Sequence, residues 1–174
     1  MLISDSLPFI RDYVEGLNMA IKSRDPEKCL SSMQRFWLSF VILGLLVTNS
    51  LCWQRYERFS LGKYKTAQMS WFFRKAKIFW DLLLWASVCC IVSVYRIKEG
   101  VLVTDDTDKQ RSKNTTKIGM VHKIKDKKTV GYFNGQSMVF ILLVCEHITI
   151  PVGFRFYEPD PSFTSWKKEV EKGR

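Results

Sequence analysis

Apolar side chains in the first hundred residues recur at helical spacing. Between residues 4 and 22 they lie three or four positions apart, at Leu7, Ile10, Tyr13, Val14, Leu17 and Ile21. This spacing places them on one face of an amphipathic helix. A second helix is expected to start at Asp25-Pro26-Glu27, with Asp25 as its N-cap, and to run towards Cys52. Leu61-Gly62-Lys63 predicts a break, and residues 66–97 predict a further helical region.

The pattern changes at Gly100. Residues 101–104 predict a short strand that ends in the acidic run Asp105-Asp106-Thr107-Asp108. Residues 138–145 form an apolar run typical of a buried strand. Residues 148–157 predict a third strand, which Pro151 confines to a sheet edge because proline cannot donate a ladder hydrogen bond. The short Glu146-His147 connection makes the last two strands an antiparallel hairpin. The pattern therefore predicts an α+β fold, with a helical region over residues 1–98 and strands over residues 99–174.

Composition and charge narrow the function. The chain has 174 residues, and 47% of them are hydrophobic, so it can bury a core. It carries 27 Lys and Arg against 17 Asp and Glu, a net charge of +10, which favours nucleic acid or an anionic membrane surface as a partner. Five cysteines without C-x-x-C spacing and only two histidines argue against a zinc site and a disulfide framework. A reduced, intracellular protein is expected.

One uncharged stretch raises the question of a membrane. Residues 36–54 contain no charged side chain and are bracketed by Arg35 and Arg55. This uncharged stretch is long enough for a helix that spans a membrane. The polar run at residues 48–50 within this window favours a buried helix of a soluble protein instead. The alternative is a small basic membrane-associated protein with one spanning helix over residues 36–54 and no catalysis.

A cluster of aromatic side chains also has two interpretations. Trp71, Phe72, Phe73, Phe79 and Trp80 lie close together in the sequence, near the cations Arg74, Lys75 and Lys77. Core packing is the ordinary role of such side chains. A platform on which nucleic-acid bases stack is the alternative.

The acidic run is followed directly by a cationic segment. Carboxylates at the end of a buried strand are held rigidly, which suits coordination of a hard cation such as Mg²⁺. The cations that follow suit phosphate contacts. The candidate phosphate-binding residues are Lys109, Arg111, Lys113, Lys117, Lys123, Lys125, Lys127 and Lys128. A metal beside a phosphate-binding surface is what enzymes that cut or join nucleic-acid backbones require. The same residues are also compatible with a solvated acidic turn and a solvated lysine-rich loop.

These segments resemble bacterial insertion-sequence transposases. The resemblance is to the DDE type with an RNase H-like catalytic core, in the insertion-sequence-four group. It is carried by residues 100–113, Lys117-Ile118, His122-Lys123, residues 125–129, Gly131-Tyr132, residues 134–136 and residues 150–154, and earlier by residues 48–50, Cys52-Trp53, residues 70–74 and residues 80–84. The chain departs from the family pattern at Thr116, where lysine is common, and at Val130, where a second glycine is usual.

The resemblance implies a fold and a chemistry. The family's core is a mixed sheet whose first three strands are antiparallel, and its first acidic residue lies on the first strand in an Asp-Thr motif. Asp106, followed by Thr107, holds that position here and would be the catalytic residue and the Mg²⁺ ligand. Adjacent strand residues face opposite sides, so Asp105 is the alternative rather than a second ligand. The implied partner is DNA, both the element ends and the target, and no membrane partner is expected. The implied location is the cytoplasm, at the nucleoid. The intact protein of this family can form a homodimer.

The other two acids of the DDE triad lie beyond the third strand in the family. Glu158, Asp160 and Glu169 come too early in the topology to fill those roles. The resemblance therefore implies an N-terminal portion of a transposase, a truncated core that contributes one of three carboxylates and is catalytically incomplete. A non-catalytic DNA-binding module is a further alternative.

Overall fold

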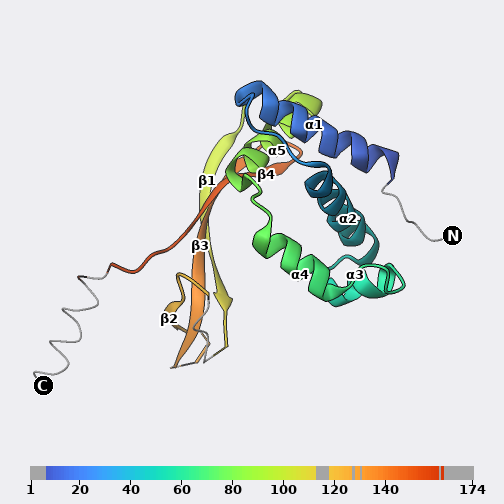
Figure 1. The fold of residues 1–174 in the computed structure, drawn as a ribbon. Coiled ribbons are helices and arrows are strands. Elements are labelled where there is room, and N and C mark those ends of the chain that lie inside the picture. The colour runs from blue at the N-terminus through green and yellow to red at the C-terminus, as the bar shows by residue number, and fades with distance from the viewer. Residues whose placement is uncertain (1–6, 113–117, 127, 130, 161, 163–174) are drawn as a thin grey trace, which may run out of the picture. The chain divides into compact units, whose positions relative to one another are not determined.

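The computed structural model describes residues 7–112, 118–126, 128–129, 131–160 and 162. It divides into two compact units, Met1–Arg96 and Ile97–Arg174. The first contains the helices α1 (Pro8–Arg24), α2 (Ser32–Thr48), α3 (Trp53–Phe59), α4 (Thr66–Lys75) and α5 (Trp80–Val94), and the second the strands β1 (Val101–Gln110), β2 (His122–Lys125), β3 (Tyr132–Val144) and β4 (Thr149–Phe156) (Figure 1). The α+β class that the pattern predicts is confirmed.

The second helix begins later than the sequence pattern predicts. Asp25 is the C-cap of α1, and the helix start expected there is wrong. Instead, the Ser31 hydroxyl accepts a hydrogen bond from the Gln34 backbone N–H, and the Gln34 side chain accepts one from the Ser31 N–H. This reciprocal capping box satisfies two backbone donors that a start at Asp25 would leave to solvent. The connecting segment is held by the buried Asn18 side chain, which accepts from the Leu30 N–H at 2.8 Å.

The long apolar stretch is broken in the structure. α2 ends at Thr48, where Asn49 adopts the left-handed conformation (φ 46°) and the Thr48 hydroxyl donates to the Gly44 carbonyl. Residues 36–54 therefore do not form one helix. The region over residues 66–97 is likewise divided, because α4 ends at Lys75 and α5 starts at Trp80. Among the helices described, none is both long and apolar enough to cross a bilayer alone; α2 with α3 and α4 with α5 reach that length only as pairs bent by 88° and 99°.

The helical unit is built around two apolar clusters. One joins α1, α2 and α5 and consists of Val14, Leu17, Ile21, Leu30, Leu38 and Ala86. The other joins α2, α3 and α4 and consists of Trp37, Phe40, Tyr56, Met69, Phe72 and Ile78. Tyr56 is fully buried and its ring lies against Gly44, where a Cβ atom would come within 2.9 Å of a ring carbon. Glycine at this position therefore lets α2 and α3 approach closely.

The sheet unit is antiparallel, with β3 at its centre. β1 pairs with β3 along one edge, from Val101 opposite Val144 to Gln110 opposite Gly135. β2 pairs with the first residues of β3 and β4 with its last ones, and the register places both on the edge opposite β1. β4 has one strand partner in the described part of the sheet, so the prediction that the Pro151 strand lies at an edge is confirmed. The tight hairpin between β3 and β4 is also confirmed, closed by the Cys145 N–H donating to the Ile148 carbonyl.

The strands extend further than their apolar runs. β1 continues through the acidic residues to Gln110, so the prediction that it ends at Asp105 is wrong. Its extension is possible because β3 begins at Tyr132 and supplies cross-strand partners for every residue from Asp105 to Gln110. Asn134 and Gly135, residue types that are common in turns, lie inside β3. The short strand β2 lies in the lysine-rich segment and was not predicted.

Candidate functional site

The acidic residues of β1 are divided between the two faces of the sheet. Asp106 lies opposite Val139, and Asp108 lies opposite Ser137, so these two carboxylates share one face. Asp105 lies opposite Phe140 on the other face. The alternation of strand side chains thus separates Asp105 from Asp106, as the sequence argument predicts.

A hydrogen-bonded chain surrounds Asp108 on the Asp106 face. The Ser137 hydroxyl lies 2.6 Å from the Asp108 carboxylate, to which it donates, and 3.3 Å from His122 Nε2. His122 Nδ1 lies 3.2 Å from the Met120 carbonyl, and its ring is 5.2 Å from the Tyr157 ring. This chain orients Asp108. Asp106, in contrast, has a side chain without a hydrogen-bond or ion-pair partner among the described residues, so its carboxylate is available to a ligand.

The outer edge of β1 is open. Across the described residues, β1 pairs only with β3, and all ten of its residues are exposed. The expectation that the carboxylates end a buried strand is therefore wrong. The Asp105 side chain accepts a hydrogen bond from the Asp106 backbone N–H at 3.0 Å. This contact satisfies one of the backbone donors that an unpaired strand edge otherwise presents to solvent.

The described carboxylates do not by themselves fit a Mg²⁺ site. Asp106 and Asp108 are two residues apart on one strand, so their Cα atoms are separated by about 6–7 Å. Asp108 is already engaged by Ser137. No group of three or more His, Cys, Asp or Glu side chains in the described segments is arranged to hold a metal ion. Mg²⁺ retains waters and uses one or two carboxylates plus other oxygen ligands, so Asp106 would need partners from elsewhere.

Three of the candidate phosphate-binding lysines lie together on the face opposite Asp106. Lys109 is opposite Gln136, Lys123 is opposite Asn134, and Lys125 is opposite Tyr132. Residues 132, 134 and 136 alternate along β3 and therefore share a face. All three lysines, which we call the sheet lysines, are exposed. They form a basic surface at the end of the sheet where β1 and β2 flank β3.

Arg111 has a structural role that the sequence does not reveal. Its backbone N–H donates to the Asn134 carbonyl at 2.7 Å, and its Nε donates to the Gln136 side chain at 2.9 Å. Gln136 is buried and donates in turn to the Gly119 carbonyl at 2.6 Å. Arg111 thus helps to fix the segment that leads into β2, in addition to its charge.

Of the remaining candidate cations, Lys128 lies in the described part of the connection between β2 and β3. Lys128 is exposed, and its backbone N–H donates to the Asp126 carboxylate, which also accepts from the Thr129 hydroxyl. These hydrogen bonds lower the pKa of Asp126. Lys113, Lys117 and Lys127 lie outside the described residues, as do the family departures at Thr116 and Val130.

Residues of the acidic run and of the cationic segment, which adjoin in the sequence, are thus divided between the two faces of the sheet. Asp106 and Asp108 occupy one face, while the sheet lysines occupy the other together with Asp105. Ser137 and His122, which hold Asp108, carry no sequence signal of this role because only the strand register brings them together. Comparison of the chain with protein-family models, with curated proteins and with solved structures gave no match.

Proposed function

We propose that this chain is the N-terminal portion of a DDE transposase with an RNase H-like core, that it binds DNA through the sheet lysines, and that it contributes Asp106 as the first metal-ligating carboxylate. The observation that carries the proposal is the position of Asp106. It lies on an antiparallel strand that is paired on one side only, with its carboxylate unengaged within the described residues.

The strand order supports this proposal. In the family that the sequence resembles, the first three strands are antiparallel, and the strand with the first acid is flanked on its other side by strands from later in the chain. Here β4, β3 and β1 form an antiparallel series with β1 at the open end. The short β2 is then an addition within the connection between the first two strands of the core.

The function assigned to this chain itself is DNA binding. Strand cleavage would need carboxylates beyond those described, so no chemical step is assigned to these residues alone. The sheet lysines share one face of the sheet, and Lys128, in the connection between β2 and β3, is exposed as well. Each lysine that neutralises a phosphate releases condensed counterions, which makes affinity depend steeply on salt. The intact protein would act in the cytoplasm, at the nucleoid.

Salt-dependent binding to duplex DNA tests the proposal. Fluorescence anisotropy with two 30-base-pair duplexes of unrelated sequence would be measured between 50 and 200 mM NaCl. Four phosphate contacts predict a slope of log affinity against log salt of about −3.6, with similar affinities for the two sequences. Absence of binding at 50 mM, or binding that salt does not weaken, would refute the proposal.

A membrane-associated protein remains a second candidate because one end of α2 exposes apolar side chains. Leu46 and Val47 are 60% and 54% exposed, and Leu51, just after the helix, is 73% exposed. Flotation with neutral and anionic vesicles separates the candidates. Co-flotation with neutral vesicles would favour the membrane function, since burial of apolar surface does not require lipid charge.

A further inference from the structure

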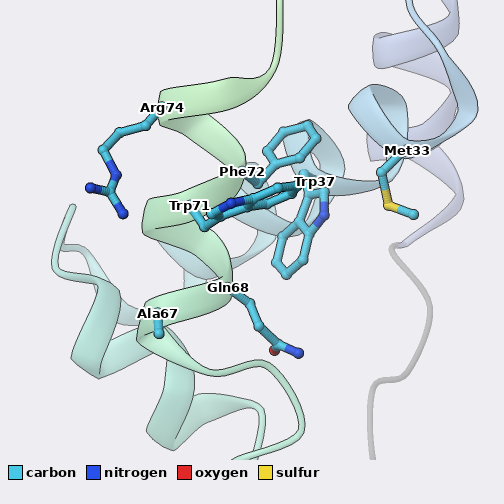
Figure 2. Close-up of a pocket in the computed structure, with 7 residues that line it drawn as sticks. All are labelled: Met33, Trp37, Ala67, Gln68, Trp71, Phe72 and Arg74. Carbon is cyan, nitrogen blue, oxygen red and sulfur yellow. The ribbon is translucent and has the colours of Figure 1, made fainter.

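An apolar pocket lies between the start of α2 and α4, entirely within the helical unit. It has a volume of about 600 Å³ and is lined by Met33, Trp37, Ala67, Gln68, Trp71, Phe72 and Arg74 (Figure 2). Trp37 and Phe72 are buried and form its floor, whereas Trp71 is 60% exposed. Figure 2 shows the Trp71 indole reaching from α4 towards Trp37. The pocket is within the range of about 300–1,000 Å³ that is usual for ligand sites.

The exposure of Trp71 is not explained by core packing. Its neighbour Phe72 packs into the aromatic cluster, 5.7 Å from Trp37 and 5.1 Å from Phe73 between ring centroids. Trp71 instead leaves an indole face accessible to solvent. An exposed indole beside an apolar pocket is suited to stacking on a flat ring. Of the two interpretations of this aromatic segment, core packing therefore applies to Phe72 and leaves Trp71 for another role.

The segment that contributes Trp71 to the pocket is cationic. Between Glu57 and Asp81 the chain contains six Lys or Arg residues and no acid, and one of the six, Lys65, is paired with Glu57 at 3.4 Å. Arg74 and Lys75 follow Trp71 by three and four positions, so they lie beside it on the helix surface. Both are exposed, and neither forms an ion pair within the described residues; Arg74 Nε donates to the Ser70 carbonyl. A ligand that combines a flat ring with negative charge complements both the exposed indole and the neighbouring cations. An apolar side chain of a protein partner would complement the indole but not the cations.

We propose that this pocket binds an unpaired nucleobase of single-stranded DNA, which stacks on Trp71 while its flanking phosphates contact Arg74 and Lys75. The inference rests on the proposed DNA-binding function and adds a second, single-strand-selective contact in the other unit. Selectivity arises because a base within a duplex has both faces covered by its neighbours. Stacking is largely independent of base identity, so little preference among bases is expected from Trp71. Gln68 is the one neutral amide that lines the pocket, and its side chain is the group there that could hydrogen-bond a base edge.

The test uses the whole chain with fluorescein-labelled (dT)₂₀ and a 20-base-pair duplex. Trp71→Ala is expected to weaken (dT)₂₀ binding by about 5- to 150-fold, the range typical of losing one stacked base, and to change duplex binding less than twofold. Trp71→Phe should restore most of the loss because it keeps an aromatic face. The double variant Arg74→Ala/Lys75→Ala should flatten the salt slope on (dT)₂₀ by about 0.7 for each phosphate contact.

Phe9→Ala is the matched control, because Phe9 is 61% exposed in the same unit and lies outside the pocket. It should leave both affinities unchanged. If Trp71→Ala binds (dT)₂₀ as wild type does while duplex binding keeps its salt dependence, the pocket proposal is overturned and the DNA-binding function stands. Equal losses on both DNAs, not rescued by Trp71→Phe, would also overturn it, since Trp71 would then act through the fold. A wild-type chain that binds neither DNA would overturn both proposals.

Discussion

The sheet lysines provide the sharpest prediction about DNA binding. Replacing Lys109, Lys123 and Lys125 together by alanine removes three cations from one face of the sheet. All three side chains are exposed, and no ion pair joins any of them to a described residue. The substitutions therefore take away charge without leaving a buried partner unsatisfied, and the fold is expected to tolerate them.

The size of the effect follows from the number of lysines. Three lost phosphate contacts reduce the magnitude of the salt slope by about 2.7. Between 50 and 200 mM NaCl, the wild-type chain should therefore lose about fortyfold more affinity than the triple variant loses. The wild-type chain should thus lose affinity steeply over this range, while the triple variant should lose little beyond what Lys128 and the helical unit contribute.

A control of equal charge separates local contacts from net charge. The variant Arg11→Ala/Lys22→Ala/Lys98→Ala also removes three exposed cations, none of them from the described strands. Both triple variants fall from a net charge of +10 by the same amount. Fluorescence anisotropy on a 30-base-pair duplex would then compare three slopes. Equal slopes for the two variants would refute the assignment, because net charge alone would account for binding.

Two further predictions concern the stability of the helical unit. Gly44→Ala should lower the free energy of unfolding by about 1–3 kcal/mol, the usual cost of overpacking, because the new Cβ would lie 2.9 Å from the buried Tyr56 ring. Gly16→Ala in α1 should instead raise the free energy of unfolding by about 0.5–1 kcal/mol, because its Cβ meets nothing within 4 Å and alanine favours a helix. Denaturant unfolding measures both changes, and the same sign for the two variants would contradict this prediction. The Thr66 backbone N–H, which donates to the Glu57 carboxylate at 2.8 Å, and the nearby Lys65 ammonium lower the pKa of Glu57 below its usual 4.5. The resulting stabilisation is therefore fully present above pH 4.5 and is lost as the pH falls through the lower pKa of the folded state. The melting temperature of wild type should therefore exceed that of Glu57→Gln near neutral pH and approach it under acid, whereas a gap that widens in acid would contradict the assignment.

The sequence predicts the helical elements where their apolar spacing is regular. The first helix, expected to reach Lys22, is observed as Pro8–Arg24. The pattern misplaces the start of the second helix because Asp25-Pro26 is a plausible cap in isolation, whereas the Ser31–Gln34 capping box sets the observed start. α3 is too short for its periodicity to be distinguished from a turn.

The strands show where tertiary pairing overrides local pattern. Polar residues 105–110 have no apolar run to mark them, and they become strand because β3 pairs with each of them. β2 had a signal: His122 and Ile124 are half-buried, while Lys123 and Lys125 between them are exposed, a period of two within a basic segment. The separation of Asp106 from the sheet lysines could not be predicted, because it depends on a register that includes the unpredicted β2.

The role of Asp106 is the central claim, and strand cleavage tests it most directly. The measurement is Mg²⁺-dependent cleavage of element-end DNA by the product of the reading frame extended through the downstream genomic DNA, with the 174-residue chain assayed alongside. We expect the extended product to cleave this DNA, Asp106→Ala to abolish the cleavage and Asp105→Ala to retain it. The 174-residue chain alone should not cleave, since two-metal chemistry needs more than one carboxylate. Cleavage that survives Asp106→Ala, or a downstream frame without a later Asp and Glu, would contradict this role of Asp106.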